Sequence, residues 1–407
     1  MKIAIIGSGP AGITAAKTLR QKEFQGEILM FSGEKSPPYA PAALGRYLIE
    51  DDEDILYWQG KNICSKLNIK HYAGEKVIEV MPDHKLLRTE VQREVQYDKL
   101  LIASGSSLKI SEALSGYDKA GLLNFKNLEA TRRVKELAEA ENGSAVIVGG
   151  GFIGVEIALC LTELGIEPTV LNRRGWIMPR LLDKETGAYV VEDLEKKGVN
   201  VRLNTEGSRI MGEKEITGVE TSSGDIITGD LYIAATGVQA NTDFIQNSGI
   251  KYASDGIPVN KLLQTNYQDV YACGDVAKTR DFLSNNLKSH GLHPVAVKHA
   301  STAAKNMLGK NIEYERMVSM NSLKELSYKM IVVGMLEGEV IKENSDEYFR
   351  KLYLQDDKIV GFVLLGDITN SGLYLSLLKR QSEVTEIKDE LISPRFNNYD
   401  LLTKYSL

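Results

Sequence analysis

Two glycine-rich turns constrain the fold of this chain more than any other feature. GSGPAG runs from Gly7 to Gly12 and GGGFIG from Gly149 to Gly154, and each follows a short apolar run, KIAII or AVIV. Each turn also opens a segment of helical composition, after which a second apolar run follows, EILMFS or PTVLN. This order of strand, glycine turn, helix and strand predicts a βαβ unit, and two such units predict two bound dinucleotides.

The glycines of each turn have a physical role in this prediction. A phosphate must approach exposed backbone N–H groups, a side chain would block it, and the positive end of the following helix dipole favours the anion. The alternative is the ordinary turn of an α/β protein, which the flanking strands and helix disfavour. The predicted cofactor-binding residues are Gly7, Gly9, Pro10, Ala11 and Gly12 in the first turn, and Gly149, Gly151, Phe152, Ile153 and Gly154 in the second.

The ends of the second strands carry the candidate ribose ligands. An acidic residue is expected about 20 residues after the last glycine of such a turn. Ser32 stands there in the first unit and Glu34 two residues later, so Glu34 is either a ribose ligand or a solvated loop carboxylate. The second unit ends in Asn172, Arg173 and Arg174. Arginine pairs with a 2′-phosphate, which favours NADP(H), whereas Asn172 alone on the ribose with two surface arginines would favour NAD.

Composition narrows the classes of function. The length of 407 residues predicts two or three domains, and the net charge of −6 argues against non-specific binding to nucleic acid. No apolar run reaches the length of a membrane span and no signal peptide is recognised, so we expect a cytoplasmic protein. Cys64, Cys160 and Cys273 form no CxxC pair, which argues against a local redox dithiol and a cysteine-rich iron–sulfur site, and we predict no metal site.

Further motifs complete a recognisable order. LLIASG and LYIAATG are predicted strands that end at glycine, and QTNYQDVYACGDVA places Gly274 and Asp275 after another strand. Together with the two turns, this order resembles the pyridine nucleotide-disulfide oxidoreductase superfamily of two-dinucleotide flavoproteins. The resemblance implies FAD on the first turn, NAD(P)H on the second, and Asp275 as a ligand of the ribityl chain of FAD. It also implies cofactor contacts at Ala103, Ser104, Gly105, Thr236, Gly237, Gly274 and Val295.

The same resemblance implies the fold class. We expect an α/β protein with two Rossmann-like dinucleotide-binding domains of the glutathione-reductase-like kind, plus a C-terminal α+β domain. The expected boundaries are 1–108 and 232–311 for FAD, 109–231 for NAD(P), and 312–407 for the C-terminal interface domain. Within the last of these, RKLYLQDDKIVGFVLLGD predicts a β-hairpin that turns at Asp356-Asp357-Lys358.

HPVAVKHASTAAKNMLGK is similar to a helix of the superfamily whose start faces the pyrimidine ring of the flavin. A helix dipole in that place stabilises negative charge on reduced flavin. His299 within it is either a group that titrates near the flavin or, as we favour, a structural residue. Cys273, next to Gly274, is expected to pack as a small buried side chain.

The segment PPYAPAALGRYL contains no thiol. Thiol-using members of the superfamily carry a cysteine beside the flavin, and its place falls on Ala42. The segment is more similar to YSRPLLSKYL of a branch with rubredoxin reductases, ferredoxin reductases and the flavin part of nitrite reductases. There a lysine pairs with the glutamate of GxGxxGxE near the flavin and the nicotinamide. The resemblance thus implies Arg46 and Glu156 as an ionised catalytic pair, and the alternative for Arg46 is a surface charge on a helix.

Without a thiol, electrons must leave the flavin for an external acceptor. The resemblance implies an FAD-dependent NAD(P)H:acceptor oxidoreductase that exchanges single electrons with rubredoxin, ferredoxin or an iron–sulfur subunit. YAPAAL is loosely similar to the flavin subunit of phenylglyoxylate dehydrogenase, which favours a hetero-complex, and a homodimer is the other expected assembly. Two alternatives stay open: a redox-sensing flavoprotein similar to apoptosis-inducing factor, and an NAD(P)H oxidase.

Overall fold

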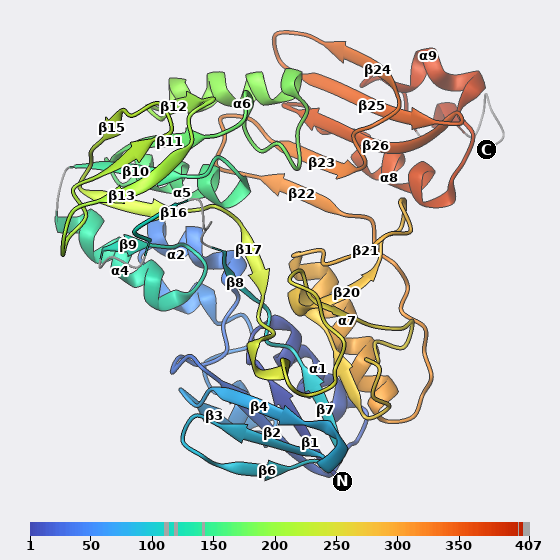
Figure 1. The fold of residues 1–407 in the computed structure, drawn as a ribbon. Coiled ribbons are helices and arrows are strands. Elements are labelled where there is room, and N and C mark those ends of the chain that lie inside the picture. The colour runs from blue at the N-terminus through green and yellow to red at the C-terminus, as the bar shows by residue number, and fades with distance from the viewer. Residues whose placement is uncertain (110–113, 118–120, 141–142, 398, 402–407) are drawn as a thin grey trace. The chain divides into compact units, whose positions relative to one another are not determined.

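The structure is a computed structural model and describes residues 1–109, 114–117, 121–140, 143–397 and 399–401. Its contacts divide the chain into two compact units, whose elements are labelled in Figure 1. Unit 1 comprises residues 1–109, 126–132 and 237–317, and unit 2 comprises residues 110–125, 133–236 and 318–407.

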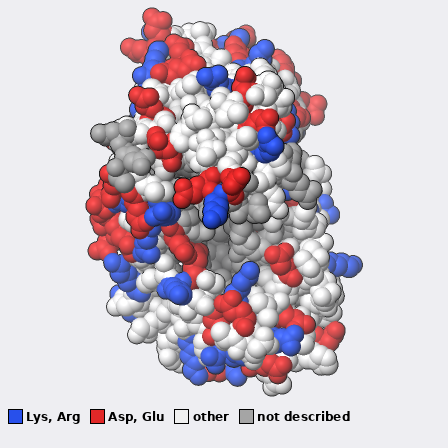
Figure 2. Space-filling view, turned by 60° about the vertical axis from the view of Figure 1, so that its left-hand side comes forward, with Lys and Arg blue, Asp and Glu red and all other residues white. Residues whose placement is uncertain are grey.

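The described surface carries charges of both signs. Acidic and basic side chains are interspersed over the face drawn in Figure 2, as expected of a chain with 49 basic and 55 acidic residues. Among the described residues, no helix combines the length and the apolar character that crossing a membrane requires.

Unit 1 is built on a parallel sheet of five strands in the order β19-β7-β1-β2-β3. The strands are β1 (Lys2–Ile6), β2 (Glu27–Ser32), β3 (Lys70–Ala73), β7 (Lys99–Ile102) and β19 (Val270–Ala272). Apart from their first residues, β1, β2 and β7 are buried throughout, as expected of parallel strands covered on both faces. The predicted strands KIAII and EILMFS are therefore confirmed, and their carboxyl ends lie side by side.

The two faces of this sheet are covered by different layers. On one face, Ile5 packs in a core with Ile13 of α1 (Pro10–Gln21) and Ala300 of α7 (His293–Met307). On the other face, Leu29 packs with a small antiparallel sheet made of β4 (Val77–Met81), β5 (Leu86–Thr89) and β6 (Glu94–Gln96). Both predicted helices are confirmed, and the buried side of α1 includes Ile13, Ala16 and Leu19.

The remaining elements of unit 1 are short and connect its main layers. The strands are β8 (Ser106–Leu108), which pairs with β17 (Val238–Ala240), and the sheet of β18 (Ile257–Pro258), β20 (Ala277–Arg280) and β21 (Leu287–Lys288). The helical segments are η1 (Pro41–Ala43), α2 (Leu44–Glu50), η2 (Glu53–Leu56), α3 (Ile63–Lys66), η3 (Pro82–His84), η4 (Asp243–Ile245) and η5 (Gly274–Val276).

Unit 2 contains the second βαβ unit. Its parallel sheet has the order β12-β11-β10-β16-β9, made of β9 (Leu122–Leu123), β10 (Ser144–Val148), β11 (Glu167–Asn172), β12 (Asn200–Leu203) and β16 (Leu231–Ala234). The helices are α4 (Leu128–Ala140), whose first turn belongs to unit 1, α5 (Phe152–Glu163) and α6 (Lys184–Lys196). A small antiparallel sheet follows, made of β13 (Gly207–Met211), β14 (Gly218–Thr221) and β15 (Ile226–Ile227). The predicted order of strand, turn, helix and strand is confirmed here as well.

The last part of unit 2 is an antiparallel sheet with helices. The sheet has the order β22-β23-β26-β25-β24, made of β22 (Met320–Leu323), β23 (Met330–Gly334), β24 (Glu339–Asn344), β25 (Phe349–Gln355) and β26 (Lys358–Leu365). The helical segments are α8 (Ser371–Arg380), η6 (Thr385–Ile387) and α9 (Lys388–Leu391). The predicted hairpin of β25 and β26 is confirmed. Its loop is Asp356-Asp357, with φ of +48° and +55°, which matches a two-residue type I′ turn.

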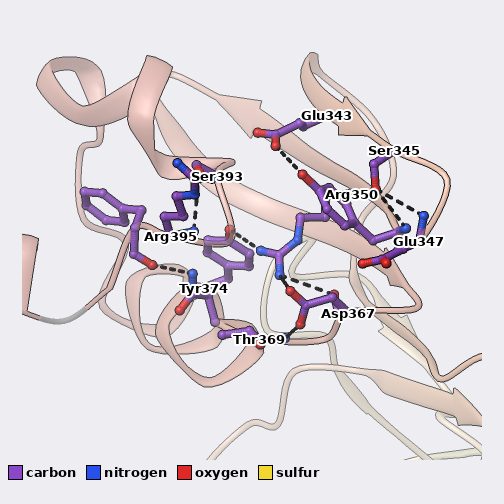
Figure 3. Close-up of polar contacts among 12 residues, drawn as sticks. Glu343, Ser345, Glu347, Arg350, Asp367, Thr369, Tyr374, Ser393 and Arg395 are labelled. Atoms are coloured by element: carbon purple, nitrogen blue, oxygen red, sulfur yellow. Dashed lines mark hydrogen bonds and ion pairs between the residues drawn. The ribbon is translucent and has the colours of Figure 1, made fainter.

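The hairpin buries charged side chains, which its sequence did not predict. Arg350 is fully buried, and its guanidinium donates to Asp367 Oδ2 at 2.9 Å and lies 3.4 Å from the Tyr374 hydroxyl (Figure 3). Lys351 is 5% exposed and pairs with Asp183 and Glu185 at the start of α6. Both faces of β25 are covered, so these cations are stabilised inside the fold by carboxylates from other elements.

Candidate functional site

In the first glycine turn, two glycines are closely packed against backbone and one faces open space. Gly7 has φ of +107°, and a Cβ there would lie 2.1 Å from the Ala103 carbonyl oxygen. A Cβ at Gly12 would lie 2.0 Å from the Gly7 oxygen, so neither position accepts a side chain without a backbone shift. At Gly9, which caps α1, a Cβ would meet no atom within 4 Å. The turn therefore presents open backbone at the start of a helix, which is where a phosphate binds.

The second turn repeats this geometry in unit 2. Gly149 has φ of +120°, with its Cβ position 2.3 Å from the Ala235 oxygen, and a Cβ at Gly154 would lie 1.9 Å from the Gly149 oxygen. Gly151, the N-cap of α5, again faces open space. Both turns thus fit the pyrophosphate of a dinucleotide, and the strand ends next to them contain predicted contacts such as Ser104 and Thr236.

Glu34 lies just beyond the end of β2. Its carboxylate is partly buried, and Oε2 accepts a hydrogen bond from the Tyr39 hydroxyl at 2.8 Å. The same hydroxyl accepts from the backbone N–H of Leu128 at 3.0 Å. Burial raises the pKa of Glu34, although these donors oppose the shift. The role of Glu34 as a ribose ligand stays a prediction, but it is not a freely solvated loop carboxylate.

The corresponding strand end of the second unit is organised by Asn172. Its amide nitrogen donates to the carbonyls of Arg174 at 2.7 Å and Trp176 at 2.8 Å, which fixes the loop after β11. Arg173 is exposed and lies 3.3 Å from Glu206, while the Arg174 guanidinium lies over the Trp176 ring. Because both amide hydrogens are used locally, Asn172 can offer a ribose only its oxygen, and the choice between NAD and NADP stays open.

Asp275 follows the strand β19 in a short 3₁₀ segment. Its Oδ2 accepts from the Ser106 hydroxyl at 2.8 Å and lies 3.5 Å from the Lys126 ammonium. The Ser289 hydroxyl donates to the Asp275 carbonyl at 2.6 Å. Gly274 has φ of +75°, and a Cβ there would lie 3.0 Å from Ala11 Cβ, so the predicted GD motif packs against the first glycine turn.

The sequence did not reveal the partners of Asp275. Ser106 directly follows the predicted strand end at Gly105, and that proximity was an available signal. Lys126 lies 149 positions away along the chain, and no local pattern marks it. Only the path of the chain through unit 1 brings these polar groups to one place.

Arg46 and Glu156, the predicted catalytic pair, belong to different units, and their pairing stays a prediction. Arg46 lies on α2, where its guanidinium forms a two-point ion pair with Glu50 and its side chain is 59% exposed. Glu156 lies on α5, and burial, with a further contribution from the charge of Glu325, raises its pKa to about 7. Within unit 2, Glu156 is thus poised between its neutral and charged forms at neutral pH, and Glu325 is a neighbour that the sequence did not indicate.

The α7 helix contains a histidine that behaves as a core residue. His299 is fully buried, its Nε2 lies 3.3 Å from the Thr279 hydroxyl, and its ring packs edge-on against Tyr314. Burial lowers its pKa to about 3, so the imidazole is neutral at physiological pH. The structural interpretation of His299 is confirmed. Val295 is also buried, and its contact with the cofactor stays a prediction. Cys273 is fully buried in the core, as predicted.

The three cysteines of the chain lie far apart in the sequence and none forms a disulfide. Cys160 and Cys273 are fully buried, and Cys64 is partly buried. Burial raises the pKa of each thiol, that of Cys64 to about 11. At neutral pH all three are therefore protonated thiols and poor nucleophiles.

Two glycine turns of the same geometry, each on its own parallel sheet, define a protein of the two-dinucleotide class. The chain belongs to the pyridine nucleotide-disulphide oxidoreductase family, whose sequence model matches residues 1–305.

Several characterised proteins are similar over most of this chain. The nitrite reductase [NAD(P)H] of Bacillus subtilis is 29% identical over 95% of this chain and 48% of its own length. The NADH-rubredoxin oxidoreductase of Clostridium acetobutylicum is 28% identical over 90% of this chain and 92% of its own length. The chain spans about half the length of the B. subtilis nitrite reductase and of the nitrate reductase electron transfer subunit from the same species.

Solved structures agree with this fold. The crystal structure of the C. acetobutylicum NADH:rubredoxin oxidoreductase has a TM-score of 0.78 and 26% identity, covering 95% of this chain and 97% of that one. The putidaredoxin reductase in its covalent complex with putidaredoxin has a TM-score of 0.88 over 96% of this chain and 95% of that one. At 21% identity it shows the fold alone.

Proposed function

We propose that this chain is an FAD-dependent NAD(P)H oxidoreductase without a redox-active disulfide, which exchanges electrons with a rubredoxin-type or iron–sulfur protein. The observation that carries the proposal is the pair of open glycine turns in a chain whose three cysteines form no disulfide and are protonated at neutral pH. Its relatives include a rubredoxin oxidoreductase and nitrite reductase, which supports an external acceptor. We further propose that it acts in the cytoplasm, alone or as the flavin subunit of a larger complex.

The described residues suggest how each cofactor would be held. In unit 1, the open backbone at Gly9 and the start of α1 would receive the pyrophosphate of FAD, with Glu34 at the ribose and Asp275 at the ribityl chain. In unit 2, Gly151 and the start of α5 would receive the pyrophosphate of NAD(P)H. The bound flavin supplies the conversion of a two-electron hydride into single electrons.

The chain contributes placement and electrostatics to this reaction. Ser106 and Lys126 orient the carboxylate of Asp275, and the Lys126 ammonium compensates part of its charge. Glu156, with a pKa of about 7, can hold or release a proton near neutral pH, which suits a group beside a reacting nicotinamide. In this proposal the FAD-binding domain comprises residues 1–108 and 232–311, the NAD(P)-binding domain 109–231, and the interface domain 312–407.

The decisive experiment is anaerobic stopped-flow mixing of the flavin-loaded protein with NADH and, separately, with NADPH. We expect one of them to bleach the flavin rapidly, which identifies the donor and the ribose preference of the loop after β11. Addition of oxidised rubredoxin or ferredoxin should then restore the flavin absorbance. If flavin is bound but neither nucleotide bleaches it on the timescale of turnover, the proposed oxidoreductase activity of this chain is refuted, and a long-lived charge-transfer complex would instead favour a redox sensor.

A further inference from the structure

Tyr39 connects the end of β2 to the beginning of α4. Its hydroxyl donates to Glu34 Oε2 at 2.8 Å and accepts from the Leu128 N–H at 3.0 Å, and its side chain is buried at 6% exposure. The two contacts join residues 5 and 89 positions away from Tyr39, and all three lie in unit 1. A buried hydroxyl that both donates and accepts has its orientation fixed, so it in turn fixes the carboxylate it contacts.

The surroundings explain why Glu34 needs such a partner. Burial raises the pKa of its carboxyl group, and the nearby Glu129 carboxylate acts in the same direction, while the Tyr39 hydroxyl and the Leu128 N–H favour the charged form. A carboxylate has about four acceptor positions. The bonds from Tyr39 and the backbone therefore leave Glu34 able to accept from a further hydroxyl.

We propose that Tyr39 is a positioning residue for the adenosine end of FAD, holding the Glu34 carboxylate so that it accepts from the adenosine ribose. This inference rests on the proposed function, and it assigns a role to the thiol-free segment PPYAPAALGRYL, in which Tyr39 lies. The segment that lacks the flavin-side cysteine thus supplies the support for the opposite end of the cofactor.

The test is FAD binding to the 407-residue chain freed of flavin, measured by fluorescence titration. Because a hydrogen bond to a charged group is at stake, Tyr39→Phe should raise the Kd for FAD by about tenfold. Glu34→Ala removes the acceptor and should raise the Kd at least as much. The double variant should bind FAD no more weakly than Glu34→Ala alone, because both changes remove the same interaction. FMN carries no adenosine, so its Kd should be the same for Tyr39→Phe and the natural chain.

Tyr57→Phe is the matched control, because the Tyr57 hydroxyl donates to Glu53 at 2.6 Å in the same unit. It should leave the Kd for FAD unchanged. Thermal melting of the flavin-free variants shows whether each is folded. If Tyr39→Phe does not fold, Glu34→Ala breaks the same hydrogen bond from its acceptor end.

The outcomes separate this inference from the proposed function. If the natural chain binds FAD but Tyr39→Phe binds it equally well, the role of Tyr39 is refuted and the proposed function stands. Additive effects of the two substitutions, or an equal loss of FMN binding, also refute the positioning role. If the natural chain binds no FAD, the proposed function itself fails.

Discussion

Replacement of Gly151 by alanine tests nucleotide binding at the second glycine turn without disturbing the fold. Gly151 has φ of −80° and ψ of −175°, which any residue adopts, and a Cβ there would meet no protein atom within 4 Å. We therefore expect the variant to fold normally. Its methyl group would occupy the space through which a phosphate approaches the start of α5. Loss of one hydrogen bond to a charged group corresponds to about 1.5–3 kcal/mol, so the Kd for NAD(P)H should rise by about 10- to 150-fold.

The assay is titration of the flavin-loaded protein with the nucleotide, together with its flavin content and melting temperature. Gly9→Ala is the matched variant in unit 1, where the Cβ position is equally open, and it should weaken FAD binding instead. Gly154→Ala is the contrasting control, because its Cβ would lie 1.9 Å from a backbone oxygen and should destabilise the protein itself. A folded Gly151→Ala variant that binds NAD(P)H as tightly as the natural chain would refute the assignment of this turn.

Three further predictions concern buried titratable groups. Asp367→Asn leaves the fully buried Arg350 guanidinium without its carboxylate and should lower the free energy of unfolding by about 3–5 kcal/mol. Arg350→Met should lower the free energy of unfolding by less, because the Asp367 side chain is 36% exposed and stays hydrated. Urea unfolding measures the free energy of unfolding of both variants, and equal losses would contradict this account. His299 stays neutral in the fold with its pKa near 3, whereas the unfolded chain takes up a proton below about pH 6.5. Stability should therefore fall as the pH drops below 6.5, by about 2 kcal/mol at pH 5, and melting curves of His299→Gln should lack this component. Glu325→Gln should lower the pKa of Glu156 from about 7 but leave it above 4.5, because Glu156 remains buried. Infrared titration of the carboxyl band measures this pKa, and an unchanged value would show that Glu325 has no influence on it.

Local signals predicted the parts of the fold in which neighbours along the chain are also neighbours in space. The strand KIAII, the glycine turn and the helix from Pro10 follow one another along the chain. The apolar run of the strand and the glycines of the turn can therefore be recognised in consecutive residues. The same holds for the hairpin around Asp356-Asp357, where two residues of positive φ bring Gln355 opposite Lys358.

The contacts that the sequence did not reveal join distant segments. Lys126 reaches Asp275 across 149 positions and Tyr39 reaches Leu128 across 89, and neither pair has a spacing that marks it. The burial of Arg350 and Lys351 could not be predicted from the strand itself, because it depends on carboxylates supplied by other elements. From sequence alone, a charged residue in a strand is expected to face solvent, because charged side chains are rarely buried without a partner.

The ion pairs of Lys351 bear on how this architecture can be divided. Its ammonium is 5% exposed and is shared by Asp183 and Glu185, which begin helix α6 of the second βαβ unit. A chain truncated before the C-terminal sheet would leave those two carboxylates facing each other without a cation, at the helix start that Asp183 caps. Removal of the C-terminal sheet should therefore destabilise the start of α6. A chimera that takes this sheet from a relative would also need the α6 helix of that relative.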